Sequence, residues 1–217
     1  MYRLCIFDLD GTLLNTIHAL TYTTNKTLEK FGLPGIVPEQ TKHMVGDGYK
    51  KQIERALIAC GDTELLHYEE ALPLYMENFR KYCMKDVVPY DGISHLLAYL
   101  KEKGIKIAVY SNKPHAQAVE NVETIFGADY FDCVRGECPE VPKKPAPDGA
   151  LLICRDLLFT PSDCLYLGDT NTDMRTGHAA GMDTAGVTWG FRDREELLAF
   201  HPKYLVDHPL EIEEIVK

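Results

Sequence analysis

The chain has 217 residues, of which 45% are hydrophobic and 26% charged, so it can bury one good core, or one main domain with a small insert. Its 33 acidic and 23 basic residues give a net charge of −10, which argues against general nucleic-acid binding because that requires clustered Lys and Arg. An anionic substrate would have to be attracted by a local cation and not by the overall field of the protein.

The seven cysteines are scattered along the chain, and none of them form a C-x-x-C motif. Cys133 and Cys138 lack a matching second pair or a nearby His, so we expect reduced thiols and no zinc site. Asp8 and Asp10 are incompatible with a secretory leader, and no apolar run approaches the roughly 20 residues of a membrane span. We therefore expect a cytoplasmic protein without a membrane partner. A monomer or a weak homodimer is expected, although no sequence feature specifies the oligomeric state.

Short apolar runs rich in β-branched residues alternate with segments of helical periodicity. The predicted strands are residues 3–7, 105–111, 130–136, 164–169, 183–190 and 203–207. The predicted helices between the later strands are residues 91–104, 113–127, 146–158 and 171–181. This alternation predicts an α/β fold, with a Rossmann-like parallel sheet and helices on both of its faces.

One interval, residues 16–84, breaks this alternation because it contains no convincing strand. Its helix-like segments are residues 18–32, 48–61 and 63–83. We therefore predict a core domain made of residues 1–15 and 85–217, with a small all-helical domain, residues 16–84, inserted after the first strand.

Polar side chains follow the first predicted strand, at the edge of an open α/β sheet where ligands bind. Asp8 and Asp10 are two residues apart, so both side chains can reach one exposed point. Gly11 and Thr12 add a flexible turn and a hydroxyl. The alternative is that these residues only form the turn after the strand.

Three further segments add polar groups at predicted strand ends or near them. Ser111 and Asn112 could hold an oxyanion, and Asp169 and Asp173 lie one turn apart if a helix begins after Asp169. Lys144 precedes a proline, which is expected to keep its segment extended. The alternatives are a helix N-cap for Asp169 and an ordinary surface position for Lys144.

Several carboxylates and a lysine at one edge are consistent with a divalent cation and a phosphate group. Mg²⁺ prefers oxygen ligands and commonly binds one or two carboxylates together with a substrate phosphate. Bound Mg²⁺ would turn the mutual repulsion of Asp8, Asp10 and Asp169 into attraction to the ion. We therefore expect a Mg²⁺ site that accepts a phosphorylated ligand.

DLDGT at residues 8–12, the strand end at Ser111, Lys144 before proline and GDTNTD at residues 168–173 resemble, in this order, the motifs of the haloacid dehalogenase-like phosphohydrolases. The resemblance spans essentially the whole chain and includes the helical insertion, which is similar to that family's C1 cap. It implies hydrolysis through an aspartyl-phosphate intermediate.

By this resemblance, Asp8 is the nucleophile, and Asp10 first protonates the leaving oxygen and then activates water. The metal ligands would be the Asp8 carboxylate, the Asp10 main-chain carbonyl and Asp169, with Asp173 supporting the metal or orienting Lys144. Ser111, Asn112 and Lys144 would bind the phosphoryl group, supported by Gly11 and Thr12. Dehalogenation needs no acid to protonate a leaving oxygen, so the presence of Asp10 also argues against a dehalogenase.

Many members of the family have Asp where this chain has Asn15. Asn can still cap the first helix of the insertion and serve as a hinge, so we expect little loss of chemistry.

The insertion is expected to choose the substrate. The loop MVGDGYK, residues 44–50, could contact the leaving group through Gly46, Asp47 and Gly48, or it could be a plain turn between helices. This loop resembles the phosphoglycolate phosphatase branch, together with SNKPH (111–115), KKPAPDG (143–149) and VTWGFR (187–192). The substrate is therefore expected to be a small phosphorylated metabolite such as 2-phosphoglycolate. The alternatives are a mutase similar to β-phosphoglucomutase, an inorganic pyrophosphatase, and a regulatory protein without activity.

Overall fold

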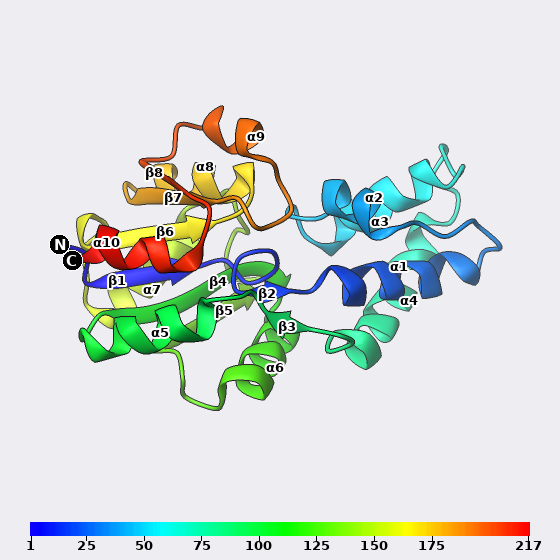
Figure 1. Cartoon of the computed structure of the whole chain (residues 1–217). Coiled ribbons are helices and arrows are strands. Elements are labelled where there is room, and N and C mark those ends of the chain that lie inside the picture. Colours follow the sequence, from blue (N-terminus) through cyan, green and yellow to red (C-terminus); the bar gives the residue numbers. More distant parts are fainter. The chain divides into compact units, whose positions relative to one another are not determined.

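The computed structural model describes all residues, 1–217, and divides the chain into two compact units. The first unit contains residues 1–15 and 89–217, and the second contains residues 16–88. Figure 1 gives the course of the chain and the element labels.

The first unit is built on a six-stranded parallel sheet with the strand order β5-β4-β1-β6-β7-β8. The strands are β1 (Leu4–Phe7), β4 (Lys106–Pro114), β5 (Cys133–Glu137), β6 (Cys164–Gly168), β7 (Asp183–Val187) and β8 (Tyr204–Val206). β1 is completely buried because it is central in the sheet and covered on both faces, which explains its continuous apolar sequence. The predicted fold class is confirmed.

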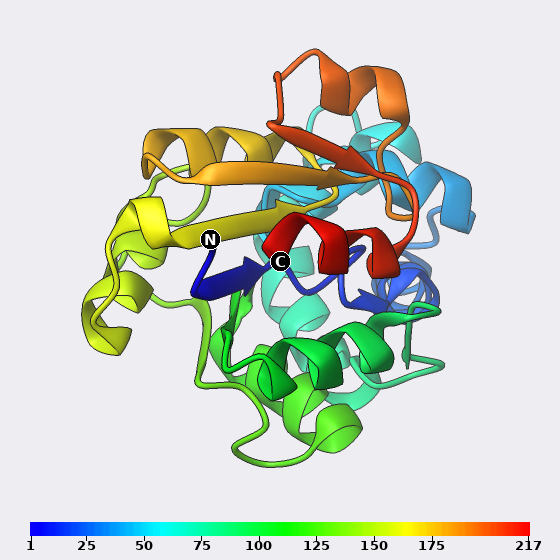
Figure 2. The ribbon, with the colours of Figure 1, turned by 60° about the vertical axis from the view of Figure 1, so that its left-hand side comes forward.

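Helices cover both faces of this sheet. They are α5 (Ile93–Glu102), α6 (His115–Phe126), α7 (Asp148–Leu157), α8 (Asn171–Ala179), α9 (Arg194–Leu198) and α10 (Ile212–Val216), with short 3-10 segments at Pro161–Asp163 and Pro209–Glu211. α5 and α10 lie on one face, and α7 and α8 lie on the other (Figures 1 and 2). α5 buries one apolar face, as its helical spacing requires: Ile93, Leu96, Leu97 and Leu100.

The second unit contains four helices: α1 (Ile17–Glu29), α2 (Pro38–Met44), α3 (Tyr49–Ala59) and α4 (Tyr68–Tyr82). α2, which is short and has proline at its first position, was not predicted from the sequence. Inside this unit Gln52 donates to the Thr24 hydroxyl at 2.9 Å and accepts from the Tyr75 hydroxyl at 3.2 Å. This buried polar network links α1, α3 and α4.

Two local expectations about these elements are wrong. The N-cap of α1 is Thr16 and not Asn15. Lys144 lies in a turn and not in an extended segment, and its peptide bond to Pro145 is cis. The two short strands β2 (Leu14–Asn15) and β3 (Val88–Pro89), which were not predicted, form a separate two-stranded sheet.

Candidate active site

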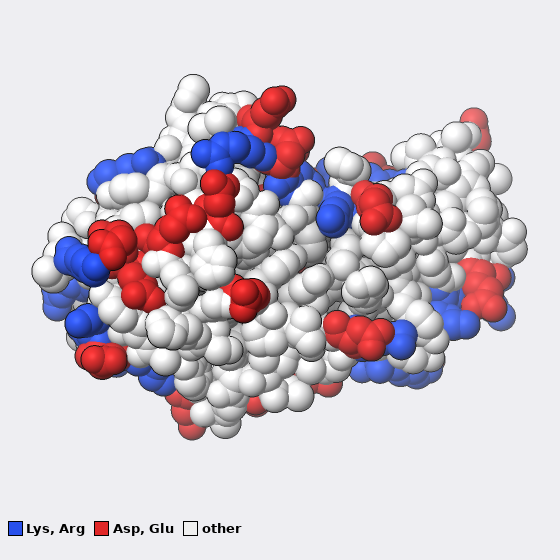
Figure 3. All heavy atoms as spheres, in the orientation of Figure 1, with Lys and Arg blue, Asp and Glu red and all other residues white.

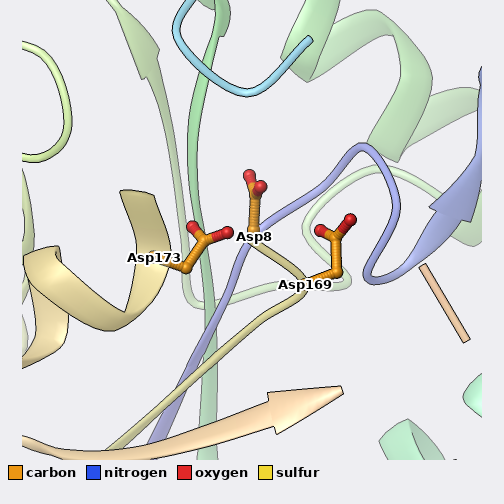
Figure 4. A group of neighbouring side chains, drawn as sticks. All are labelled: Asp8, Asp169 and Asp173. Carbon is orange, nitrogen blue, oxygen red and sulfur yellow. The ribbon is translucent and has the colours of Figure 1, made fainter. Parts of the chain in front are cut away.

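Three aspartates come together at the carboxyl edge of the parallel sheet, and we call them the acidic cluster: Asp8, Asp169 and Asp173. Asp8 directly follows β1, Asp169 directly follows β6, and Asp173 lies in the first turn of α8. One carboxylate oxygen of each lies within 4.8 Å of the others. Figure 4 shows Asp8 and Asp169 projecting side by side, with the Asp173 carboxylate directed towards Asp8.

The Asp169 carboxylate is held by two hydrogen bonds. The Thr12 hydroxyl donates to Oδ1 at 2.9 Å, and the Phe191 amide donates to Oδ2 at 2.8 Å. Two glycines make room for it: a Cβ on Gly11, whose φ is +89°, would lie 2.2 Å from Asp169 Oδ2, and a Cβ on Gly190 would lie 2.3 Å from Asp169 Cβ. The roles of Gly190 and Phe191 are not predicted from the sequence, because nothing in VTWGFR, residues 187–192, indicates what its backbone faces.

Asp173 joins the acidic cluster to the start of α8. Thr170 is the N-cap of this helix, so the alternative of an N-cap role for Asp169 is excluded. Asp173 Oδ2 accepts from the amide and the hydroxyl of Thr170, at 3.1 and 2.7 Å, and Oδ1 accepts from Lys144 Nζ at 2.7 Å. These contacts fix both oxygens of a side chain that has no solvent exposure.

Lys144 is one of the most buried side chains of the protein, which excludes an ordinary surface position. Its ammonium lies between two carboxylates, 2.9 Å from Asp8 Oδ1 and 2.7 Å from Asp173 Oδ1. Burial alone would lower the pKa of Lys144, but the attraction of Asp173 and Asp8 outweighs burial and raises it well above its usual value. Lys144 is therefore a permanent positive charge in the site.

Asn112 holds the backbone of Lys144. Its Nδ2 donates to the Lys144 carbonyl at 3.1 Å, and its Oδ1 accepts from the Lys144 amide at 2.9 Å. The neighbouring Ser111 hydroxyl accepts from the Lys113 amide at 3.2 Å, which leaves its own proton for a ligand. Two residues predicted to bind phosphate, Asn112 and Lys144, are thus directly linked to each other.

Asp10 is not part of the acidic cluster, and its carboxylate has a partner that the sequence analysis missed. Lys113 Nζ lies 2.8 Å from Asp10 Oδ1. The Lys113 side chain is only 1% exposed, whereas that of Asp10 is 17% exposed. An alternating pattern of exposed and buried residues does not distinguish Lys113 from its neighbours in the strand, because every residue of β4 from Ile107 to Lys113 is buried.

Burial penalises negative charge in this site. Burial, with further repulsion from Asp173, raises the pKa of Asp8 to about 7, although Lys144 opposes the shift. Burial and repulsion from Asp173 and Asp8 raise the pKa of Asp169 well above its usual value. Ionised carboxylates here require more positive charge than the two lysines supply.

The residues present fit a divalent cation. When all are ionised, four carboxylates (Asp8, Asp10, Asp169 and Asp173) face two ammonium groups, and the two excess negative charges match one divalent ion. The donor set of the acidic cluster consists of oxygen atoms alone, which suits Mg²⁺ better than a softer metal.

The other predicted residues lie in the helical unit. Gly46, Asp47 and Gly48 form the loop between α2 and α3, and both glycines have positive φ. Asp47 Oδ2 pairs with Arg55 Nη2 at 2.5 Å, and Arg55 also donates to the Met44 carbonyl at 2.9 Å. Arg55 therefore fixes Asp47 within this loop.

No helix is both long enough and apolar enough to cross a bilayer. On the face drawn in Figure 3, acidic and basic side chains are mixed and form no continuous basic area.

Comparison with known proteins agrees with this geometry. Residues 5–187 match the model of the family described as haloacid dehalogenase-like hydrolase. The chain is 32% identical over 193 residues to the phosphoglycolate phosphatase of Aquifex aeolicus, covering 87% of this chain and 86% of that protein. It is 30% identical over 217 residues to the N-acetylmuramic acid 6-phosphate phosphatase of Pseudomonas aeruginosa, covering 97% and 93%.

A solved structure extends this similarity to three dimensions. The crystal structure of a candidate phosphoglycolate phosphatase from Lactobacillus delbrueckii subsp. bulgaricus superposes with a TM-score of 0.92 at 30% identity. The superposition covers 99% of this chain and 98% of that one.

Proposed function

Because this chain belongs to the haloacid dehalogenase-like hydrolase family, we propose that it is a Mg²⁺-dependent phosphatase of small phosphorylated metabolites, with 2-phosphoglycolate as the first substrate to test. The observation that carries this proposal is the position of Lys144 Nζ between Asp8 and Asp173, two members of the acidic cluster. Buried ionisable groups with strongly shifted pKa values that gather at one point are typical of functional sites.

Asp8 would attack phosphorus in this mechanism. Lys144 Nζ and the Leu9 amide both contact Asp8 Oδ1, which leaves Oδ2 for the attack or for the metal. A bond forms between the attacking oxygen and phosphorus while the bond from phosphorus to the leaving oxygen breaks, giving an aspartyl-phosphate. Asp10 donates a proton to the leaving oxygen.

The second step returns Asp8 to its starting state. Asp10, now ionised, takes a proton from water, and the resulting hydroxide attacks phosphorus while the bond between phosphorus and the Asp8 oxygen breaks, which releases phosphate. Lys144 and the Ser111 hydroxyl stabilise the equatorial oxygens, and Asn112 holds Lys144 in place through its backbone. Asp8, Asp169 and the Asp10 main-chain carbonyl would hold Mg²⁺, which supplies charge neutralisation for the phosphoryl group, and Asp173 would orient Lys144.

We propose that the helical unit, residues 16–88, is a cap that selects the substrate through the loop containing Gly46, Asp47 and Gly48. The relatives leave this choice open, since proteins about equally similar to this chain are named for phosphoglycolate and for N-acetylmuramic acid 6-phosphate. Seven free cysteines and a metabolite substrate support a reducing compartment, the cytoplasm. The monomer or weak homodimer remains a prediction.

The test is phosphate release with Mg²⁺ from a panel containing 2-phosphoglycolate, N-acetylmuramic acid 6-phosphate, β-glucose 1-phosphate and pyrophosphate. We expect release from at least one phosphate monoester and none with Asp8→Asn. Formation of glucose 6-phosphate would instead indicate a mutase, and preference for pyrophosphate would indicate a pyrophosphatase. No release from any substrate would contradict the proposal. Asp47→Asn should change the order of preferred substrates and not abolish release.

A further inference from the structure

The site contains a second buried lysine, Lys113, that the proposed mechanism does not use. Its ammonium lies 2.8 Å from Asp10 Oδ1, and its side chain is 1% exposed. An ordinary lysine keeps its ammonium in water, so a lysine buried at this depth needs an anionic partner. Asp10 supplies that charge at hydrogen-bonding distance.

The backbone around Lys113 is fixed by its neighbours. The regular pairing of β4 with β5 shifts between Tyr110 and Pro114, so Lys113 lies in an irregular part of the strand. Its amide donates to the Ser111 hydroxyl at 3.2 Å. Gly136 in β5 allows close approach, because a Cβ there would lie 2.6 Å from the Lys113 carbonyl oxygen. The ammonium therefore extends from a rigid base.

The two buried lysines have separate partners. Lys144 contacts Asp8 and Asp173, whereas Lys113 contacts Asp10. Asp10 is the most exposed carboxylate residue of the site, since the members of the acidic cluster are all buried. Its side chain can rotate unless a contact holds it. An ammonium on Oδ1 fixes this rotation and leaves Oδ2 as the oxygen that exchanges a proton.

We propose that Lys113 is a positioning residue that orients the Asp10 carboxylate for proton transfer to the leaving oxygen. The inference rests on the proposed function, because it assigns Lys113 to the acid–base step of that reaction. Lys113 pairs with the proposed acid Asp10, whereas Lys144 pairs with Asp8 and Asp173, so removal of Lys113 should affect proton transfer more than phosphoryl binding.

The test compares two classes of leaving group. The leaving group of an alkyl phosphate such as 2-phosphoglycolate is an alkoxide, which leaves poorly unless it receives a proton. The leaving group of p-nitrophenyl phosphate is a stable phenolate, which leaves without one. The ratio kcat/KM reports the first phosphoryl transfer to Asp8 in both cases. For Lys113→Met we expect about a 100-fold loss on the alkyl phosphate and less than about a 10-fold loss on the aryl phosphate, since general acid catalysis contributes about 10²–10⁴-fold.

Three controls accompany this variant. Lys106 lies in the same strand, and its Nζ pairs with Asp132 Oδ1 at 2.6 Å. Lys106→Met should leave the rates on the alkyl and the aryl phosphate unchanged. Lys113→Arg should recover part of the rate on the alkyl phosphate because it restores a cation near Asp10. Adding Lys113→Met to Asp10→Asn should cause little further loss. Circular dichroism and Mg²⁺ titration verify that each variant folds and binds metal.

Equal losses on both substrates would overturn the inference, because they would indicate damage to the phosphoryl site as a whole. A rise in KM without a change in kcat would also overturn it, because Lys113 would then bind substrate directly. Failure of the proposed function would look different, since the wild-type protein would hydrolyse neither substrate. A Lys113→Met chain that does not fold moves the test to Lys113→Arg, for which equal losses on both substrates likewise overturn the inference.

Discussion

The substitution Asp8→Asn should change how the stability of the metal-free protein depends on pH. The Asp8 carboxyl is buried, and its pKa of about 7 in the folded protein exceeds its usual value of 3.8. Between these values the folded protein holds a proton that the unfolded chain has lost. Stability therefore falls as pH rises from about 4 to about 7 for this group, and the asparagine removes that dependence.

The magnitude follows from the same two values. Each pKa unit corresponds to about 1.4 kcal/mol, so raising the pH from 5 to 8 should cost wild type roughly 2 to 3 kcal/mol relative to Asp8→Asn. The attraction between Lys144 and ionised Asp8 needs no separate correction, because it already opposes the rise of the Asp8 pKa and is contained in the value of about 7. Lys144 keeps its partner Asp173 in the variant.

The assay is urea unfolding of both proteins in EDTA at pH 5, 6, 7 and 8. The free energy of unfolding of wild type should fall steadily relative to that of Asp8→Asn as pH rises. Saturating Mg²⁺ should reverse this loss for wild type at pH 8. A difference that stays constant from pH 5 to 8 would refute the reasoning, because the Asp8 pKa would then be the same in the folded and unfolded states.

Three further outcomes are expected. Mg²⁺ affinity, measured by calorimetry, should increase as pH rises through about 7, since Asp8 must lose its proton before it can bind a cation; affinity independent of pH would contradict the raised pKa. Gly11→Ala should reduce Mg²⁺ binding and activity at least about 10-fold, because the new Cβ would meet the Asp169 carboxylate. The control Gly104→Ala is also at positive φ but has open space around the new Cβ, so it should cost only about 1 kcal/mol of stability and leave activity unchanged. Asn112→Leu should reduce kcat about 10- to 100-fold with the fold intact in circular dichroism, because both hydrogen bonds to the Lys144 backbone are lost, and an unchanged kcat would show that the turn holds Lys144 without them.

The sequence by itself determined the sheet and the position of the acidic cluster along the chain. β1 and β6 are short apolar runs, and parallel strands bring their carboxyl ends to one edge, so Asp8 and Asp169 were expected at the same edge, where the pairing of β1 with β6 makes them neighbours. The spacing of Asp169 and Asp173 likewise placed them one turn apart, because α8 begins between them. These inferences depend only on backbone periodicity, which a sequence records directly.

Only the tertiary structure decided which polar groups contact one another. Lys113 and Asp10 are distant in the chain, and no local pattern distinguishes a lysine that turns into the site from one that extends into water. The amide of Phe191 and the missing side chain of Gly190 act on Asp169 through backbone geometry, which depends on how the loop after β7 packs. Side-chain partners are set by three-dimensional packing, and periodicity along the chain cannot specify them.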